Sequence, residues 1–388
     1  MGIHDKIAAM HAEMTAWRRH IHQHPETAFE ERRTAQFITE KLKGFGIEVV
    51  TGLARGTGVV GIIKGSKPGG GAIGLRADID ALDIHEQTNK PHASKTPGKM
   101  HACGHDGHTT MLLGAASYLA ETRDFAGTAY LIFQPAEENE GGARVMVEEG
   151  LFERFAMQGV YGMHNWPGVA VGEIGVRVGP MMASYDIFEI KVVGHGAHGA
   201  MPHQGIDPVL VGAHIVTNLQ SIASRNVDPI EAVVVSVTQI HGGDAWNVIP
   251  AEVVLRGTAR SFKPQVQDLT EANIARIATG VAAAHGASVE VRYERRYPPT
   301  VNTGTETRHA ARVAAGVVGA DKVRDEVGPA MGSEDFSFML QKMPGSYIWL
   351  GAGESHPNLH SPQYDFNDDI LPIGASYWAR LVEETLKA

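Results

Sequence analysis

The chain has 388 residues, of which 43% are hydrophobic and 20% charged, and Cys103 is its only cysteine. This length and composition favour a folded protein with two domains and exclude disordered and collagen-like classes. The net charge of -10 and the lack of a Lys/Arg-rich run argue against a nucleic-acid partner. No segment has the roughly 20 apolar residues of a membrane span or the core of a signal peptide, and one cysteine forms no internal disulfide. We therefore expect a cytoplasmic protein that does not bind membranes.

Helix and strand patterns alternate along the first half of the chain. The spacing of apolar residues predicts helices over residues 5–22 and 28–43, and short apolar runs predict strands over 47–50, 58–63 and 72–79. A helix over 110–120, a strand over 128–136, a helix over 143–150 and a strand over 160–165 follow. This order predicts an α/β fold with a mixed, largely parallel sheet flanked by helices.

The pattern changes near residue 183. Strands are predicted over 184–194, 231–240, 251–262 and 288–296, with helices over 206–224 and 265–286. The order β-α-β-β-α-β is that of a ferredoxin-like α+β module. We therefore expect an inserted domain over residues 183–296, between a first part (1–182) and a second part (297–388) of the other domain. In the second part, a helix over 309–319, a strand over 347–353 and a helix over 375–388 are predicted.

The motif HACGHDGH, residues 101–108, contains three histidines, an aspartate and the cysteine. We expect it on a loop before the helix at 110–120, and α/β folds place their functional sites on loops at the carboxyl ends of parallel strands. In an extended loop, Cys103 and His105 point to the same side and can bind one metal ion. A Cys-x-His motif alone is more often a polar loop with a buried thiol.

Two adjacent carboxylates, Glu137 and Glu138, follow the strand at 128–136. Because neighbouring residues past a strand end do not face the same way, one can bind a metal while the other faces a water. A ligand beside a general base is the arrangement that a metallohydrolase needs. The spacing does not decide which glutamate has which role, and a solvated acidic turn is the alternative.

Two more histidines, His164 and His360, follow apolar runs and are expected on loops after strands. Each alone is more often a hydrogen-bonded polar residue than a ligand. Together with Cys103, His105 and a glutamate they form a donor set that suits zinc or another late first-row ion, and not magnesium or calcium.

The remaining histidine clusters have simpler explanations. His20, His22 and His24 fit a helix end and its cap. His195 and His198 lie on a glycine-rich turn of the inserted module, where glycine permits close approach of a ligand but a hairpin loop fits equally.

Three further polar features remain open to two explanations. Asn247 and Arg260 lie on or beside strands of the inserted module; arginine suits a substrate carboxylate, but a surface arginine on an edge strand is more common. For Glu334 and Asp335, capping of a helix by Ser333 is a sufficient explanation.

Nine segments occur in one order along the chain: LRADIDAL, MHACGHDGH, LIFQPAEE, GMHNWP, GAHGAMPH, NVIP, GTARSF, MGSEDFSF and LHSP. This series resembles the M20 metallopeptidase family, and most closely its amidohydrolase branch, which contains hippurate hydrolase, N-acyl-amino-acid amidohydrolases and plant auxin-conjugate hydrolases. The likeness covers nearly the whole chain. One departure is Asp83, where the family usually has proline; this position is outside the ligand set.

The resemblance implies a role for particular residues. Two divalent ions (Zn, Mn, Co or Ni) are expected on the residues that match the family's ligands, which are Cys103, His105, Glu138, His164 and His360. Glu137 matches the general base, and His198 matches a histidine that helps to hold the oxyanion. Asn247 and Arg260 match residues that engage the substrate, and some of these contacts come from a partner's inserted domain. In the family that domain is a lid and a dimerisation surface, which implies a homodimer.

The expected reaction is hydrolysis of the amide bond of an N-acyl amino acid or small peptide-like substrate, by a metal-activated water with Glu137 as general base. Arg260 is expected to bind the substrate's carboxylate. In a second hypothesis Cys103 is a nucleophile with His105 or His101 as its base, which leaves the other ligands idle. In a third, the protein binds metal without turnover, and the presence of Glu137 counts against this.

Overall fold

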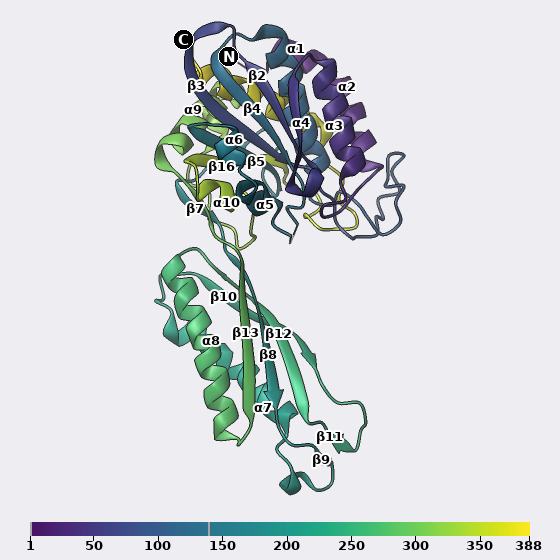
Figure 1. The fold of residues 1–388 in the computed structure, drawn as a ribbon, viewed down its shortest axis with the longest axis vertical. Helices are drawn as coiled ribbons and strands as arrows, with labels where there is room; N and C mark the ends of the chain where they lie inside the picture. The colour runs from purple at the N-terminus through teal and green to yellow at the C-terminus, as the bar shows by residue number, and fades with distance from the viewer. Residues whose placement is uncertain (1, 139) are drawn as a thin grey trace. The chain divides into compact units, whose positions relative to one another are not determined.

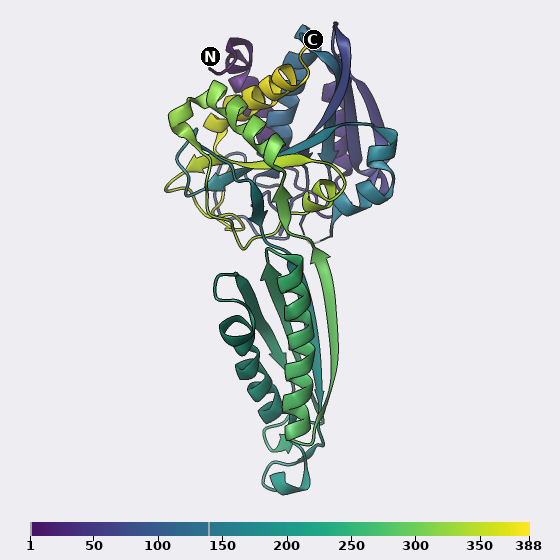
Figure 2. The same ribbon diagram turned by 90° about the vertical axis from the view of Figure 1, so that its left-hand side faces the viewer.

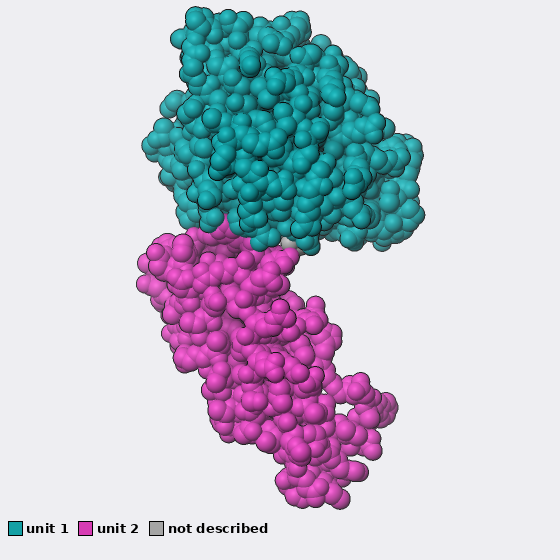
Figure 3. Space-filling view, in the orientation of Figure 1, with its two compact units in different colours: residues 1–181, 301–328, 335–388 teal, residues 182–300, 329–334 magenta. Residues whose placement is uncertain are grey.

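The protein is described by a computed structural model over residues 2–138 and 140–388. The chain forms two compact units, coloured separately in Figure 3. Unit 1 comprises residues 1–181, 301–328 and 335–388, and unit 2 comprises residues 182–300 and 329–334. The predicted inserted module, 183–296, falls within unit 2, which also takes the short segment 329–334 from the second part of the chain.

The centre of unit 1 is a mixed sheet (Figure 1). Over the described residues its strand order is β1-β2-β4-β3-β5-β16-β6-β15, in which β4, β3, β5 and β16 are mutually parallel and β1 and β2 are antiparallel to their neighbours. This confirms the predicted mixed, largely parallel α/β sheet. The bounds of these strands are β1 (Glu48–Leu53), β2 (Gly58–Lys64), β3 (Lys67–Asp78), β4 (Ala126–Gln134), β5 (Gly159–Pro167), β6 (Ile174–Gly175), β15 (Val323–Arg324) and β16 (Gly345–Gly353). Two short strands, β7 (Gly179–Met182) and β14 (Thr300–Asn302), pair with each other.

Helices flank this sheet. They are α1 (Asp5–Ala9), α2 (His11–His22), α3 (Arg32–Gly44), α4 (His105–Thr122), α5 (Gly142–Glu148), α6 (Leu151–Arg154), α9 (Gly304–Val318), α10 (Ser337–Leu340) and α11 (Leu371–Thr385). The helix α4 packs against α11, α2 and β3. The helix α4 is buried from His105 to Ala116; its first turns are polar, and its apolar residues from Met111 to Leu119 lie in the hydrophobic core.

Two predicted helices have different limits. The helix expected over 5–22 is interrupted at Met10, which separates α1 from α2. The helix expected from residue 28 begins only at Arg32, because Phe29 has a φ of 62° and lies in a turn. The carboxylate of Glu26 then accepts hydrogen bonds from the N–H groups of Arg33 and Thr34 and so caps α3.

Unit 2 is an α+β module in which every residue is described. Its elements are β8 (Tyr185–Val193), β9 (Ala197–His198), α7 (Pro208–Leu219), β10 (Val233–His241), β11 (Val248–Ile249), β12 (Glu252–Ser261), α8 (Pro264–Ala284) and β13 (Ser288–Tyr297). The antiparallel sheet has the order β10-β12-β8-β13, and α7 and α8 cover one of its faces (Figure 2). The main elements thus follow the predicted β-α-β-β-α-β order.

In the part of the chain that the structure describes, none of the helices combines the length and the apolar character that crossing a membrane requires.

Candidate metal centre

The carboxyl ends of the parallel strands gather polar side chains that are far apart in the sequence. Asp78 is the last residue of β3 and Gln134 the last of β4. His360 lies on the loop after β16, as expected, whereas His164 lies inside β5 and not on a loop. The expectation for His164 is wrong because β5 continues past it and pairs His164 with Trp349 of β16.

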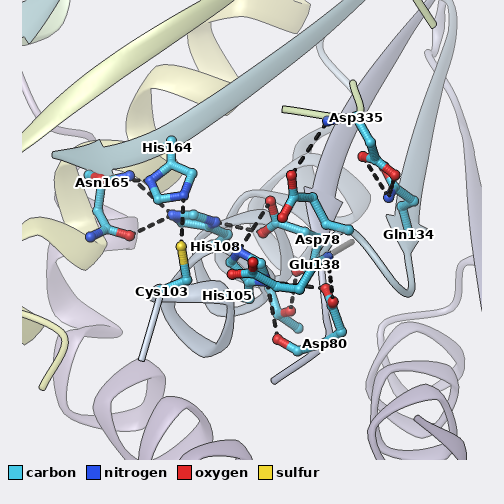
Figure 4. Close-up of polar contacts among 12 residues, drawn as sticks. Asp78, Asp80, Cys103, His105, His108, Gln134, Glu138, His164, Asn165 and Asp335 are labelled. Atoms are coloured by element: carbon cyan, nitrogen blue, oxygen red, sulfur yellow. Dashed lines mark hydrogen bonds and ion pairs between the residues drawn. The ribbon is translucent and has the colours of Figure 1, made fainter. Parts of the chain in front are cut away.

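The motif at residues 101–108 reaches this edge of the sheet through a turn at Gly104. Gly104 has a φ of 93°, and a Cβ there would lie 2.1 Å from Asn165 Oδ1, so only glycine fits. The helix α4 begins immediately at His105. The expected extended conformation of this loop is therefore wrong, and a left-handed turn instead of strand alternation directs Cys103 and His105 to the same site (Figure 4).

Five side chains form one cluster. Donor atoms of Cys103, His105 and His164 lie within 4.8 Å of one another, and so do donor atoms of Cys103, Glu138 and His360. Cys103 Sγ lies 3.4 Å from His164 Nε2, and His360 Nε2 lies 3.2 Å from Glu138 Oε1. The first three residues are buried, whereas the side chain of His360 is 52% exposed. The cluster is therefore closed on the protein side and open at His360.

Hydrogen bonds outside the cluster orient two of the imidazole rings. His105 Nδ1 donates to the carbonyl oxygen of Asp80 at 3.0 Å, and His164 Nδ1 donates to the carbonyl oxygen of Asn165 at 2.6 Å. With the proton on Nδ1, each Nε2 keeps a lone pair that faces the cluster. This is the tautomer in which a histidine binds a metal ion through Nε2.

A buried layer supports the cluster from behind (Figure 4). Asp78 accepts hydrogen bonds from His108 Nδ1 at 2.6 Å and from Arg76 at 2.7 Å, and His108 Nε2 accepts from the N–H of Asn165 at 3.0 Å. The carboxylate of Asp80 accepts hydrogen bonds from His105 Nδ1 and from the N–H of Glu138. These supporting residues were not singled out in the sequence, although charged residues at alternate positions of an otherwise apolar strand, in LRADID, are a signal for them.

The two adjacent glutamates are held by different neighbours. Glu137 is only 6% exposed, and its Oε1 accepts a hydrogen bond from the N–H of Asp335 at 3.3 Å. The N–H of Glu138 donates to Asp80 Oδ2 at 2.9 Å. Each glutamate still has a carboxylate oxygen within 4.8 Å of a nitrogen of His105. Glu138 therefore belongs to the cluster, and Glu137 lies beside it.

Negative groups dominate the electrostatics of the cluster. Burial, followed by the charges of Glu138 and Glu137, raises the pKa of the Cys103 thiol well above its ordinary value. For His105, burial lowers the pKa, but the charge of Asp78 and the other nearby carboxylates outweigh burial and raise the pKa to about 10. Without a metal ion, these shifts favour a neutral thiol at Cys103 and a protonated imidazole at His105. A bound divalent cation would reverse both, because it stabilises a thiolate and a neutral imidazole.

The donor set fits a divalent metal ion. His105 Nε2 is buried and makes no hydrogen bond with any described residue, and Glu138 Oε1 is buried beside His360 Nε2. Burial also lowers the pKa of His164, which keeps its imidazole neutral. Buried polar atoms without a partner cost free energy unless a ligand satisfies them. Sulfur, nitrogen and carboxylate donors at this spacing are those of sites for zinc and other late first-row ions.

The remaining predicted site residues belong to unit 2. His198 and Asn247 are exposed and neighbour each other, since β9 pairs with β11 and the carbonyl oxygen of Asn247 accepts from the N–H of Gly199. Arg260 lies near the other end of β12, where its guanidinium packs 4.2 Å over the ring of Tyr185. Within unit 2 these predicted substrate contacts are therefore separated.

The MGSEDF segment has a structural role that differs from the expected one. Ser333 does not cap a helix, because α10 begins only at Ser337 and Arg260 donates to Ser333 Oγ at 3.0 Å. Asp335 is fully buried and accepts hydrogen bonds from Arg76 and from Gln134. It is thus part of the layer that holds Glu137. Asp83 is exposed on a loop and is absent from the metal-donor groups of the described residues.

Comparisons with known proteins agree with this geometry. The chain is 40% identical over 383 residues to an N-acetylcysteine deacetylase of Bacillus subtilis, covering 98% of this chain and 99% of that protein. It is 40% identical over 387 residues to a hippurate hydrolase of Campylobacter jejuni, covering both proteins completely. A solved Bacillus subtilis structure, described as a dinuclear metal-binding peptidase of the M20 family, superposes with a TM-score of 0.83 at 37% identity, covering 98% of this chain and 99% of that one.

The model of one peptidase family matches residues 74–384, from the end of β3 to the last turns of α11. This span includes every residue of the cluster described above. The sequence resemblance, the sheet and the donor cluster therefore agree, and the chain belongs to peptidase family M20/M25/M40.

Proposed function

We propose that the protein is a metal-dependent amidohydrolase that cleaves the amide bond of N-acyl amino acids. Two divalent ions would be held by the cluster of Cys103, His105, Glu138, His164 and His360. One observation carries the proposal: the buried carboxylate of Glu137 lies within 4.8 Å of donor atoms of His105 and Glu138. A general base thus stands beside a set of metal donors, which is the arrangement for hydrolysis by an activated water.

The chemistry divides between the ions and the chain. Divalent ions, when bound, polarise the substrate carbonyl and lower the pKa of a water. Glu137 accepts a proton from the attacking water and passes it to the nitrogen of the leaving amine as the C–N bond breaks. The products are a carboxylic acid and a free amino acid. His198 is proposed to donate a hydrogen bond to the oxyanion that forms at the carbonyl carbon.

The substrate class follows from the relatives and from one basic residue. The names of the similar proteins describe N-acetylcysteine and hippurate, which are both N-acylated amino acids with a free carboxylate. Arg260 is proposed to bind that carboxylate, and Asn247 is proposed to engage the substrate. Burial lowers the pKa of Arg260, and the charges of Tyr185 and Asp186 offset this only in part, so a substrate carboxylate would stabilise the buried guanidinium charge.

The test combines metal analysis with hydrolysis of N-acetyl-L-cysteine, N-benzoylglycine and N-acetyl-L-methionine. We expect about two ions per chain, chelator-sensitive hydrolysis and recovery on adding metal. Glu137→Gln should lower kcat by roughly 10² to 10⁴-fold while the metal content is unchanged. Glu140→Gln, an exposed carboxylate close by in the sequence, is the matched control and should leave kcat unchanged.

Two outcomes distinguish the alternatives. A protein that stays active in chelator but is inactivated by thiol alkylation would make Cys103 a nucleophile and remove Glu137 from the reaction. A protein that binds two ions but hydrolyses none of the amides would be a metal-binding protein without this turnover.

A further inference from the structure

Glu31 is a buried carboxylate that has no place in the proposed reaction. It precedes α3, its side chain is 0% exposed, and it is absent from the metal-donor groups of the described residues. Its Oε1 accepts a hydrogen bond from the N–H of Ala136 at 2.9 Å, across 105 residues of sequence. Its Oε2 is buried and makes no hydrogen bond with the described residues. A buried acid in this state is costly, so a specific structural requirement is indicated.

Ala136 is the residue immediately before the two glutamates, and its backbone is strained. It has a φ of 55°, in the left-handed region that residues with a Cβ rarely adopt. Ala136 is fully buried, so water does not satisfy its N–H. Its carbonyl oxygen accepts from the N–H of Gly142 at 2.9 Å. The N–H of Ala136 is therefore hydrogen-bonded to Glu31, and its carbonyl oxygen is hydrogen-bonded to the first residue of α5.

Close packing around Ala136 restricts the backbone conformations that the chain can adopt after β4. A Cβ at Gly142 would lie 1.7 Å from the carbonyl oxygen of Pro135, so only glycine permits this close approach. After Ala136, Glu137 is held by Asp335 and Glu138 by Asp80, as described above. The conformation of Ala136 thus sets the direction in which the chain leaves β4 and enters the metal centre.

We infer that Glu31 is a positioning residue, whose hydrogen bond to Ala136 N–H holds the left-handed turn that aims Glu137 at the metal centre. The inference rests on the proposed function only for the role of Glu137. Glu31 is not a catalytic residue, because it contacts none of the five cluster residues. What matters is an acceptor oxygen at the correct distance and not a negative charge. Burial and the charge of Asp80 raise the pKa of Glu31 to about 7, so a neutral amide is a close substitute.

Three substitutions at one position separate the possible roles. Glu31→Gln keeps the acceptor oxygen and should have a kcat close to that of the wild type. Glu31→Met has a similar volume without an acceptor, and Glu31→Asp keeps the charge on a shorter side chain. Both should lower kcat by about 10 to 100-fold with little change in KM, since a displaced catalytic group costs rate at this scale. The control is Glu26→Met, which removes the cap of α3 and should lower Tm without changing kcat per folded molecule.

Hydrogen exchange of the peptide covering residues 131–138 provides a readout that does not depend on activity. The Ala136 amide should exchange slowly in the wild type and in Glu31→Gln, and about tenfold faster in Glu31→Met and Glu31→Asp. Metal content is measured on every variant, so that kcat is compared at equal loading. If Glu31→Met fails to fold, the comparison of Glu31→Gln with Glu31→Asp still tests whether an acceptor oxygen at the correct distance is required.

Two results would overturn the inference: equal kcat in all three variants, or an equal loss in Glu31→Gln and Glu31→Met. Failure of the proposed function is distinguishable, because a wild-type protein without amidase activity would still show the exchange pattern at Ala136.

Discussion

His22 carries a buried charge that makes stability depend on pH. Burial lowers its pKa, but the hydrogen bond from its Nδ1 to Asp106 at 2.8 Å and the contact with Glu86 outweigh burial and raise the pKa to about 9. Arg18 opposes this effect and His101, which lies beside the ring, is itself buried. The protonated form of His22 is therefore the one that the folded chain favours.

The sign of the pH dependence follows from the two pKa values. The folded pKa of about 9 lies above the unfolded value of about 6.5, so the stabilisation is complete below pH 6.5 and is lost as the pH rises through 9. Its full size is about 3 kcal/mol. We expect the free energy of unfolding of the wild type, minus that of His22→Gln, to fall between pH 6 and 9.5 in urea titrations. His20→Gln, two residues earlier on the same helix, is the control, and an unchanged difference across this range would contradict the assignment.

At this scale the sequence singled out the residues that cluster in the structure, but not the residues that support them. Cys103 and His105 stand out because the single cysteine lies two residues from a histidine, in a motif of eight residues that contains three histidines. The ordering of Glu137 and Glu138 came from the resemblance, since spacing alone leaves it open. His22 was interpreted as part of a helix end, because nothing in RRHIHQHPE indicates Asp106, 84 residues away, as its partner. Long-range hydrogen bonds between buried polar residues leave no periodic signal.

Among the elements, α2 is hydrogen-bonded to the segment that follows the loop of His360. Arg18 on α2 is fully buried and donates to Asp368 through Nε and Nη2, at 2.7 and 2.9 Å, and to Asp365 through Nη1 at 2.8 Å. These three hydrogen bonds hold the start of η5 (Asp368–Ile370) against α2. Removing the arginine leaves Asp368 with only the partly exposed Arg19, and Asp365 with His92, and it takes a positive charge from beside the fully buried Asp106.

We expect Arg18→Met to lower the free energy of unfolding by about 3 kcal/mol, because the cost of an uncompensated buried charge exceeds the value of the intact pair. Urea unfolding at constant metal content measures it. In a double-mutant cycle with Asp368→Asn, the double variant should lose less than the sum of the single losses. Arg19→Met, whose side chain is 48% exposed beside the same Asp368, is the control and should cost less than about 1 kcal/mol. Additive losses would show that the two residues do not act as a pair.

The elements themselves were predictable where periodicity is strong and uncertain where it ends. The largely parallel sheet and the α+β module follow from alternating apolar runs and from the order of helices and strands along the chain, whereas the order of the strands within the sheet was not predicted. The observed helix limits differ from the predicted ones where a single residue, and not a periodic pattern, determines the backbone. Phe29 is in the left-handed region, so α3 begins later than predicted, and the turn at Gly104 lets α4 begin earlier, within residues 101–108. The sequence pattern shows a glycine at position 104, but it does not show that the side chain of Asn165 leaves no space for any other residue there.

For the whole molecule, the separation of the predicted substrate contacts within unit 2 has a consequence. His198 and Asn247 lie by β9 and β11, next to the start of β12 at Glu252, whereas Arg260 lies eight residues further along that strand. At about 3.4 Å per residue the two ends are about 27 Å apart, much longer than an N-acyl amino acid. One substrate therefore cannot touch both ends of the same copy of unit 2. If both ends serve catalysis, a second copy of the chain must supply one of them, as the family resemblance implies.

Mixing two inactive variants tests this arrangement. Glu137→Gln lacks the proposed base, and His198→Ala lacks the proposed oxyanion donor. In a mixed dimer, one site would combine Glu137 of one subunit with His198 of the other and would be intact. If half of the dimers are mixed and each has one intact site of two, activity should return to roughly a quarter of the wild-type level. Assays after mixing, unfolding and refolding the two variants together, with sedimentation to establish the dimer, measure it. Activity that stays at the level of the separate variants would place Glu137 and His198 of one site on the same chain.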